Sequence, residues 1–496
     1  MKILLNQSLK AFDLAEINPN TTVLEWLRGN QLVGTKEGCA SGDCGACTAV
    51  VGELASINNK TEIQYKTINT CIALAYSLIG KHLITVEGLS EGNKLHPVQK
   101  AMVVENGSQC GFCTPGFVMS LFAMYHNEKS VNLTKINDAL SGNLCRCTGY
   151  KPIISAAFSA LEKRQQEPSD FYKRHQEQFI TSLTELSDDS NISLSYMKNG
   201  KKINFDAPSN LNDLSKIISN NQSAKVVAAG TDLNLEITQS MREFSHIVSI
   251  NRVAELKEVK ESASEIEIGA AVSYEEAKKS LTHYWPSLDS FLQRFASLPI
   301  KNWATIGGNI ANASPIGDMA PVLIALESKL KLRKGKVSRV ILLEDFFISY
   351  KKTALDDGEF LESIIIPKPS TNDQLITHKI SKRFEDDISA VCMAINVKME
   401  QSSPESVKIT LGGMSGIPQR AKELEKVFLD HWDNDEIMSI AYEALKNEFS
   451  PFSDVRASSE YRLRVSAGLA KKSSLLLRGF KVEDLAHYSE ARTLKE

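Results

Sequence analysis

The sequence lacks the hydrophobic segments that mark secreted and membrane proteins. Its apolar start is interrupted by Asn6, Gln7 and Lys10, which leaves too short a run for the core of a signal peptide. The longest apolar stretch, residues 117–125, already contains Ser120 and falls far short of the ~18 apolar residues of a membrane span. We therefore expect a cytoplasmic protein with no membrane contact.

An excess of one charge is also missing. The 57 Lys and Arg residues nearly balance the 60 Asp and Glu residues, so the formal net charge is −3. Nucleic-acid binding needs a clustered basic face, and we expect no nucleic-acid partner. The 42% hydrophobic and 24% charged residues are ordinary for globular proteins, and 496 residues suggest about three domains.

Cysteines are few, but they are clustered. Eight of the nine lie between Cys39 and Cys147, whereas Cys392 stands alone in an apolar segment, as expected of a buried core residue. In a reducing compartment, such clustering indicates metal binding or catalysis rather than a disulfide framework.

The first cysteine group comprises Cys39, Cys44, Cys47 and Cys71. Its C-x4-C-x2-C run, with the fourth cysteine 23 residues later, is the plant-type ferredoxin spacing, in which four thiolates bind a [2Fe–2S] cluster. Gly38, Gly42 and Gly45 would let the backbone curl around a cluster. Structural zinc usually uses two C-x2–4-C pairs at other spacings, so this group predicts an iron–sulfur centre.

The second cysteine group comprises Cys110, Cys113, Cys145 and Cys147. It consists of a C-x2-C and a C-x-C motif, and each motif lies between predicted helices, so that two helix ends could hold one metal centre. From these residues alone, zinc is a serious rival to an iron–sulfur cluster.

Neither a G-x-G-x-x-G motif after a strand nor a P-loop is present, which leaves a Rossmann site unsupported. Two other segments contain glycine, VVAAGTDLN at 226–234 and TIGGNIANASPIGDMAP at 305–321. Their small residues could present backbone N–H groups to a pyrophosphate. Taken alone, each segment is more often simply a turn.

The pattern of strands, helices and breakers predicts five regions: 1–86, 87–165, 166–195, 196–375 and 376–496. The first alternates strands and turns, with a capping box at Thr22–Glu25 and a helix around 71–78. The second reads as a small helical bundle, and the third as a polar linker with room for one helix. The last two have α+β patterns.

The cysteine groups, with the sequences QCGFCTPGFVMS and GNLCRCTGY around the second, resemble the xanthine oxidase family of molybdenum hydroxylases. The resemblance implies an α+β multidomain fold: a plant-type ferredoxin β-grasp domain, a four-helix [2Fe–2S] bundle, a non-Rossmann α+β FAD-binding domain and a C-terminal α+β flavoprotein domain. It makes all eight cysteines ligands, four to each cluster. It also implies that Gln109 contacts a molybdenum cofactor from the iron–sulfur side.

The two glycine-containing segments resemble the family's G-G-T-D-L and S/T-x-G-G-N-I segments, with Ala229 in place of a glycine. The residues that the resemblance assigns to FAD are Val227, Ala228, Ala229, Gly230, Thr231, Asp232, Leu233, Phe295, Thr305, Ile306, Gly307, Gly308, Asn309, Asp318, Leu361 and Lys379. On the residues alone, Lys379 is equally well a solvated surface lysine.

A charged stretch follows Lys379 and comprises Lys382, Arg383, Glu385, Asp386 and Asp387. The resemblance places this stretch beside the flavin ring, where it governs the approach of NAD⁺. A strand-entry turn with solvated charges is an equally good interpretation of the residues themselves.

Nearly the whole chain resembles the small iron–sulfur and FAD subunit of two-subunit bacterial xanthine dehydrogenases. The resemblance implies that a separate large subunit, in a heterotetramer of two small and two large chains, binds the molybdenum cofactor and hydroxylates hypoxanthine and xanthine. Electrons then pass through two [2Fe–2S] clusters to FAD and NAD⁺. About 120 residues follow the flavin domain, too few for a molybdopterin-binding region.

Three alternatives remain open at this point. One is a subunit of a related molybdenum hydroxylase that acts on another heterocycle or an aldehyde. A second is a stand-alone iron–sulfur flavoprotein reductase without a molybdenum partner. A third is a zinc-stabilised binding module, which would give a colourless protein.

Overall fold

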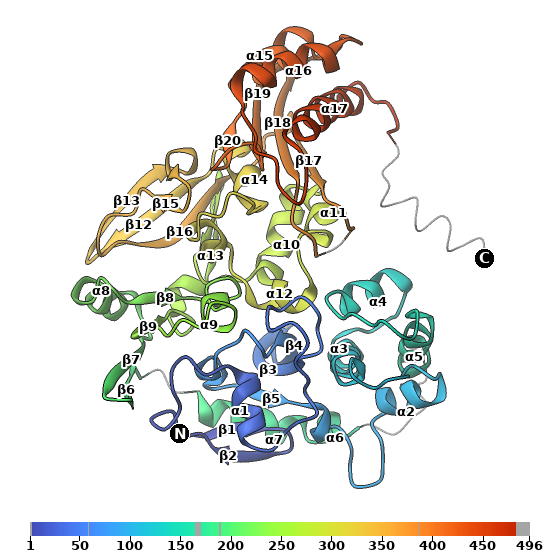
Figure 1. Ribbon diagram of the computed structural model, residues 1–496, viewed down its shortest axis with the longest axis vertical. Helices are drawn as coiled ribbons and strands as arrows, with labels where there is room; N and C mark the ends of the chain where they lie inside the picture. The colour runs from blue at the N-terminus through green and yellow to red at the C-terminus, as the bar shows by residue number, and fades with distance from the viewer. Residues whose placement is uncertain are drawn as a thin grey trace. The chain divides into compact units, whose positions relative to one another are not determined.

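The computed structural model describes residues 2–482, apart from residues 58, 163, 165–169, 188–189 and 385. The chain divides into two compact units (Figure 1). The first unit is Met1–Glu255, Ser273–Glu275 and Ser297–Thr305, and the second is Leu256–Val272, Glu276–Ala296 and Ile306–Glu496. The region predicted at 196–375 therefore contributes to both units.

The first sheet of unit 1 has five strands in the order β2-β1-β5-β3-β4. They are β1 (Lys2–Leu5), β2 (Ser8–Ala11), β3 (Thr48–Ile57), β4 (Lys60–Asn69) and β5 (His82–Ile84). Only β1 and β5 pair in parallel; the other neighbours are antiparallel. This mixed sheet with helix α1 (Val23–Gly29) is the expected β-grasp arrangement.

Helix α1 begins with the predicted capping box. Thr22 Oγ1 accepts a hydrogen bond from the Glu25 N–H at 3.1 Å, and the Glu25 carboxylate accepts one from the Thr22 N–H at 2.8 Å. The predicted helix around 71–78 is wrong, because only a 3₁₀ turn, η1 (Ala75–Leu78), forms there. The N–H groups of Leu24 and Val23 in the first turn of α1 donate to the carbonyls of Thr70 and Ala73, so this segment is bonded to α1.

Four helices follow, as predicted: α2 (Pro97–Val104), α3 (Thr114–Asn127), α4 (Leu133–Leu140) and α5 (Lys151–Glu162). Helix α3 is buried along residues 116–125 and forms the centre of the bundle core. Short 3₁₀ turns such as η2 (Val86–Gly88) precede the bundle.

The predicted linker is partly helical. Residues 171–186 form α6 (Phe171–Arg174) and α7 (Gln176–Leu186), and Tyr172, Phe179 and Leu183 are buried in the same core as α3. The sequence looked like a linker because these few apolar residues are spread among polar ones. Residues 166–169 and 188–189 of this stretch lie outside the described part of the chain.

The second sheet of unit 1 has the order β6-β7-β9-β8. Its strands are β6 (Ile192–Lys198), β7 (Lys201–Ala207), β8 (Lys225–Val227) and β9 (His246–Ser249), accompanied by α8 (Leu211–Asn220) and α9 (Leu235–Thr238). Phe205, Val227 and Ile247 share one hydrophobic core with Ile3 and Leu5 of the first sheet. The start of the predicted flavin region is therefore packed on the ferredoxin-like sheet.

Helix α12 (Leu298–Trp303) also belongs to unit 1. Asn302 Nδ2 donates to the Thr67 carbonyl of β4 at 3.1 Å, and Lys301 Nζ pairs with Asp138 at 2.9 Å. These contacts hold a segment from the middle of the chain against the N-terminal sheet.

Unit 2 contains an antiparallel sheet in the order β10-β11-β16-β12-β13. The strands are β10 (Val259–Glu261), β11 (Glu265–Gly269), β12 (Lys329–Lys334), β13 (Val337–Leu342) and β16 (Phe360–Pro367). Its helices are α10 (Tyr274–Tyr284), whose first two residues are in unit 1, α11 (Leu288–Gln293), α13 (Ile306–Ala311) and α14 (Met319–Ala325); β14 (Phe347–Ser349) and β15 (Lys352–Thr353) form a small hairpin.

A second sheet of unit 2 has the order β17-β18-β19-β20. It comprises β17 (Asp373–Ile380), β18 (Val391–Glu400), β19 (Ser403–Gly412) and β20 (Gln419–Arg420). In Figure 1 the helices α15 (Lys422–His431), α16 (Ile437–Glu448) and α17 (Ser459–Leu477) lie beside these strands, and they close one hydrophobic core with them. Within the described residues, no helix is both long and apolar enough to cross a membrane.

Replacing Thr22 by Ala should loosen helix α1. Loss of an N-cap side chain costs about 1 kcal/mol, so the backbone amides of the first turn should exchange with solvent about five-fold faster. Hydrogen exchange of the Glu25 amide measures this. Thr22→Ser keeps the hydroxyl and should exchange like the wild type; equal protection in Thr22→Ala would show that tertiary contacts alone hold the helix.

Candidate functional site

The structure brings the first cysteine group together. Cys47 and Cys71 are buried, Cys39 and Cys44 are half-buried, and the Sγ atoms of Cys47 and Cys71 lie 3.2 Å apart. The thiol of Cys39 lies within hydrogen-bonding reach of those of Cys44 and Cys71. None of the nine cysteines, all of which the structure describes, is in a disulfide. Four thiols converge here from the loop before β3 and the turn after β4.

The loop around this group depends on glycine, as predicted. Gly42 and Gly45 have φ values of 84° and 68°, a conformation that side chains rarely adopt. A Cβ on Gly45 would lie 2.3 Å from the Gly142 carbonyl oxygen, and one on Gly38 would lie 2.9 Å from Cys44 Sγ. Larger residues would push the loop off its neighbours.

The second group is also assembled, but it is more open. Cys145 is buried and Cys113 half-buried, whereas Cys110 and Cys147 are exposed. The thiols interact in two pairs, Cys110 with Cys147 and Cys113 with Cys145. One motif lies between α2 and α3 and the other between α4 and α5, as the sequence predicted.

Hydrogen bonds to sulfur favour the thiolate form that a metal centre needs. Cys145 Sγ accepts from the N–H groups of Cys147 and Thr148, each at 3.4 Å, and from Thr148 Oγ1 at 3.2 Å. Burial raises the pKa of the Cys145 thiol, but these hydrogen bonds outweigh burial and lower the pKa to about 7. In the first group, the Ser41 N–H donates to Cys39 Sγ at 3.4 Å. Both groups therefore suit a thiolate-ligated centre.

The loops that carry the two groups are hydrogen-bonded to each other. The Leu144 N–H, directly before Cys145, donates to the Cys44 carbonyl at 3.0 Å. Asn143 Nδ2 donates to the Gly45 carbonyl at 3.1 Å, and Asn143 Oδ1 accepts from Ser120 Oγ at 2.6 Å. Nothing in the sequence around Asn143 distinguished it from an ordinary loop residue.

Part of the predicted flavin site lies in unit 1. Val227 ends β8 and is buried, like Ala229, while Ala228, Thr231 and Leu233 are half-buried and Asp232 is exposed. Gly230 has a φ of 73° in the turn that follows β8. Thr305, at the end of the unit 1 segments, is buried and forms an isolated bridge with Ser273. A strand that runs into a turn is what the sequence predicted here.

The rest of the predicted flavin site lies in unit 2. Residues 306–309 form the start of α13, with Ile306 and Gly307 buried and Gly308 exposed. The buried atoms Asn309 Oδ1 and Asp318 Oδ1 have no hydrogen-bond partner among the described residues. Unpaired buried acceptors are costly, so these two atoms suit a ligand that donates from hydroxyl or N–H groups, as FAD does. Phe295 is half-buried and Leu361 is buried in β16.

Lys379 is not the solvated surface lysine that remained an alternative. It is 3% exposed, and its ammonium group pairs with Asp318 Oδ2 at 2.5 Å. It also donates to the Asp387 carbonyl at 2.8 Å and to Ser389 Oγ at 2.9 Å. These three acceptors use all three N–H bonds of the ammonium group. Lys379 therefore holds the Asp318 carboxylate and the backbone before Ser389 in place.

The described residues of the charged stretch lie between β17 and β18 and are hydrogen-bonded. The Arg383 guanidinium pairs with Asp387 Oδ1 at 3.0 Å, and Lys382 Nζ donates to the Val455 carbonyl at 2.8 Å. Burial raises the pKa of the Asp387 carboxyl group, but the hydrogen bonds from the Arg383 side chain and backbone outweigh burial and lower this pKa. Asp386 has a positive φ of 51°, and Glu385 lies outside the described residues.

The sequence prediction overlooked a buried polar cluster in unit 1. His126 Nε2 and His96 Nε2 lie 3.5 Å and 3.9 Å from Asp170 Oδ1. Burial lowers the pKa of both histidines to about 3, so both rings are neutral at physiological pH. His96 Nδ1 accepts the Val98 N–H at 3.2 Å, which places the ring proton on Nε2 and leaves that nitrogen no lone pair for a metal ion. This cluster is therefore structural.

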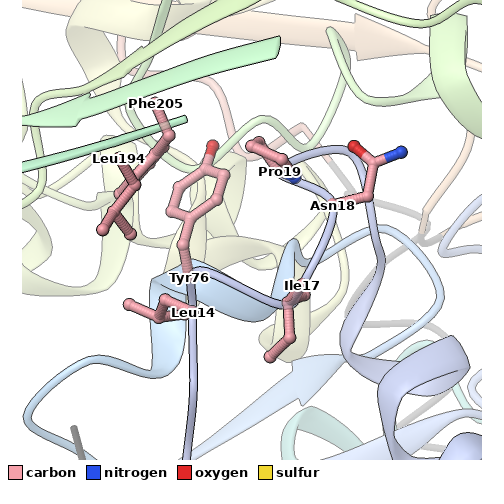
Figure 2. A pocket seen from close by; sticks show the side chains of 7 residues that line it. All are labelled: Leu14, Ile17, Asn18, Pro19, Tyr76, Leu194 and Phe205. Carbon is pink, nitrogen blue, oxygen red and sulfur yellow. The ribbon is translucent and has the colours of Figure 1, made fainter. Parts of the chain in front are cut away.

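A small hollow in unit 1 has no predicted site residue in its lining (Figure 2). Its lining consists of Leu14, Ile17, Asn18, Pro19, Tyr76, Leu194 and Phe205. Figure 2 shows the Tyr76 ring standing between Leu194 and Phe205 on one side and Pro19 on the other, and the Tyr76 and Phe205 ring centroids are 4.3 Å apart. The side chains are almost all apolar and carry no group suited to catalysis.

Four family models match consecutive parts of the chain. A 2Fe-2S iron-sulfur cluster binding domain matches residues 13–76, and a [2Fe-2S] binding domain matches 85–158. An FAD binding domain in molybdopterin dehydrogenase matches 201–369, and a CO dehydrogenase flavoprotein C-terminal domain matches 376–476. The predicted fold class and the cofactors of this chain, two [2Fe–2S] clusters and FAD, are confirmed.

Curated relatives point to one enzyme family. Xanthine dehydrogenase from Emericella nidulans is 32% identical over 463 residues, which are 83% of this chain and 34% of the relative. Xanthine dehydrogenase/oxidase from Mus musculus is 31% identical over 459 residues, 82% of this chain and 34% of the relative. The chain thus spans about a third of the length of these relatives.

Solved structures of similar fold include a Cu,Mo-CO dehydrogenase chain, with a TM-score of 0.52 and 22% identity over 56% of this chain and 97% of that chain. Another is quinoline 2-oxidoreductase from Pseudomonas putida 86, with a TM-score of 0.51 and 22% identity over 55% of this chain and 96% of that chain. At this identity the likeness supports the fold alone.

Replacing Cys44 by Ser should remove one iron–sulfur centre and leave the other. The two groups differ in burial and in hydrogen bonds to sulfur, so their electron paramagnetic resonance signals and potentials should differ. We expect loss of one signal and roughly half of the iron. Cys392→Ser, the same change outside both groups, should keep both signals. Zinc in place of iron in the wild type would contradict the assignment.

Replacing Gly308 by Val should abolish FAD binding and spare both clusters. Gly308 is exposed at the start of α13, so a side chain there obstructs a ligand rather than the core. Flavin absorbance and iron content measure the outcome. Gly416→Val is the control, because a Cβ at Gly416 would meet no atom within 4 Å. Full FAD occupancy in Gly308→Val would place the flavin elsewhere.

Proposed function

We propose that this chain, an iron–sulfur and FAD module of the xanthine oxidase family, carries electrons from a molybdenum-cofactor unit to NAD⁺. The matched domains and the xanthine dehydrogenase relatives support this proposal. When bound, the two clusters carry single electrons, and FAD collects two of them for hydride transfer to a nicotinamide.

The exposure of the two cysteine groups supports an order of electron flow. Cys110 and Cys147 of the second group are exposed, and so are the apolar side chains of Phe112 and Leu144 beside them. In the first group, Cys47 and Cys71 are buried. Exposed apolar side chains around a redox centre suit a docking face for an electron donor. We therefore place the entry of electrons at the second group.

The hydrogen bond from Leu144 to Cys44 carries this proposal. It joins the residue next to one predicted ligand, Cys145, to the backbone of another, Cys44, at 3.0 Å. The two groups are thus adjacent, as electron transfer between them requires. Gln109 is exposed next to Cys110, and we propose that it contacts the molybdenum cofactor, as the family resemblance implies.

We assign each centre to the residues that the sequence singled out. Cys39, Cys44, Cys47 and Cys71 would hold one cluster, and Cys110, Cys113, Cys145 and Cys147 the other. The segments at 227–233 and 305–309 would hold FAD together with Phe295, Asp318 and Leu361, and Lys379 would fix the Asp318 carboxylate by its 2.5 Å ion pair. The proposed domains are residues 1–86 and 87–165 for the two clusters, 196–375 for FAD and 376–496 for the C-terminal flavoprotein domain, with 166–195 as the linker.

We propose xanthine and hypoxanthine as the substrates of the complex, because the two curated relatives described above are named xanthine dehydrogenase and xanthine dehydrogenase/oxidase. The molybdenum unit would be a large subunit on a separate chain, in a cytoplasmic heterotetramer of two small and two large chains. A second candidate from the sequence analysis stays open, a hydroxylase of another heterocycle or an aldehyde.

Purification of the native complex tests the proposal. We expect iron, FAD and molybdenum to co-purify with a second polypeptide, and the complex to reduce NAD⁺ with xanthine. Turnover of another heterocycle but not xanthine would favour the second candidate. Iron and FAD without any molybdenum partner would identify a stand-alone reductase.

Replacing Arg383 by Glu should slow electron transfer to NAD⁺ about ten-fold or more and leave transfer to an artificial dye unchanged. The exchange breaks the ion pair with Asp387 and reverses the charge of a turn that we place beside the acceptor. Steady-state rates with both acceptors measure the effect. Lys336→Glu makes the same charge reversal in the exposed turn after β12 and should leave both rates unchanged. Equal loss with both acceptors would indicate general destabilisation.

A further inference from the structure

Asn234, directly after the predicted flavin turn, is hydrogen-bonded to the first cysteine group. Its side chain is fully buried, and Nδ2 donates to the Ile72 carbonyl at 2.8 Å. Ile72 directly follows Cys71, a predicted cluster ligand. The contact joins residues 162 positions apart, and both belong to unit 1.

The same residue is also tied to the flavin turn. The Asn234 N–H donates to the Gly230 carbonyl at 2.9 Å. Gly230 has a φ of 73°, and a Cβ there would lie 2.2 Å from Asn234 Nδ2. The turn therefore approaches the carboxamide as closely as glycine alone permits. One side chain thus connects the flavin turn to the backbone next to Cys71.

Packing holds this connection in place. Ile72 belongs to a buried cluster with Leu24, Cys47 and Cys71, against which Leu235 packs. Asn234 Oδ1 is buried and has no hydrogen-bond partner among the described residues. An apolar side chain of this size would remove the unpaired oxygen, but it would also remove the hydrogen bond to the Ile72 carbonyl.

We infer that Asn234 is the positioning residue that fixes the flavin turn against the first cluster and that its amide forms part of the electron route between them. The inference rests on the proposed function. In the step concerned, the reduced cluster loses one electron and the flavin gains it, with any proton supplied by solvent. A continuous route runs from Cys71 through the Ile72 carbonyl and one hydrogen bond to Asn234.

Gln239 offers a matched control in the same segment of the chain. Its Nε2 donates to the carbonyls of Ala40 at 2.8 Å and Cys39 at 3.2 Å, so it also ties this segment to the first group. Gln239 is exposed and lies beyond α9, away from the turn at Gly230. Its removal takes away hydrogen bonds to the cysteine loop without interrupting the route through Asn234.

The experiment compares the cofactor-loaded full chain with its variants Asn234→Leu, Asn234→Asp and Gln239→Leu. Flash photoreduction of the clusters followed by flavin absorbance measures the rate of internal electron transfer. Redox titration by electron paramagnetic resonance gives the potential of the first cluster. Hydrogen exchange of the Asn234 amide reports the position of the turn and needs no bound flavin.

We expect Asn234→Leu to keep both clusters, to slow electron transfer roughly ten-fold or more, and to raise exchange of the residue 234 amide, because transfer depends steeply on geometry. Asn234→Asp keeps the size, loses the donor and adds a negative charge, so the first cluster should shift to a more negative potential. Gln239→Leu should transfer electrons at the wild-type rate.

Wild-type rates and exchange in Asn234→Leu, with an unchanged potential in Asn234→Asp, would overturn the inference. If both variants lose FAD, unchanged amide exchange and potential would overturn it, whereas faster exchange would support the positioning role. Absence of iron or FAD from the wild-type chain would instead refute the proposed function, so the two failures are distinguishable.

Discussion

The close backbone contact between the two cysteine loops is the constraint on which the candidate site depends. The Cys44 carbonyl accepts a hydrogen bond from the Leu144 N–H at 3.0 Å. The Gly142 carbonyl lies so close to Gly45 that a side chain at position 45 would have no room. Because a Cβ at Gly45 would lie only 2.3 Å from that oxygen, the loops can meet only through glycine. This contact fixes the β-grasp sheet and the helical bundle as neighbours and sets the two predicted clusters side by side.

The difference in burial between the two cysteine groups supports the proposed direction of electron flow. The second group is open at Cys110 and Cys147, the first is closed around Cys47 and Cys71, and Asn234 connects the first group to the flavin turn. Backbone carbonyls accept at each of these connections, and the donors are the Leu144 N–H and the side-chain amides of Asn143 and Asn234.

The predicted flavin residues of unit 2 include a buried pair of charged side chains. Lys379 and Asp318 form a buried ion pair, and burial of an ion pair is weak evidence for stability because desolvation offsets much of the attraction. Lys379 uses all its donors, yet Asp318 Oδ1 has no hydrogen-bond partner in the part of the chain that the structure describes. The ion pair therefore orients the Asp318 carboxylate and leaves its Oδ1 atom available to a ligand. Such an oxygen suits ligand binding but does not stabilise the fold.

Local signals in the sequence determined the first cysteine group, the capping box of α1, the four helices of the bundle and most strands. Each depends on spacings or patterns within one segment of the chain. The second cysteine group was assigned to a cluster only through the family resemblance, because its residues alone left zinc open. Only the tertiary structure decided that residues 71–78 form a 3₁₀ turn and no α-helix, in a segment whose carbonyls bond to α1. It likewise decided that α6 and α7 pack on the bundle, that Lys379 is buried and that Asn234 bonds to Ile72. These features depend on partners far apart in the chain, and no local pattern specifies which distant carbonyl a side chain will meet.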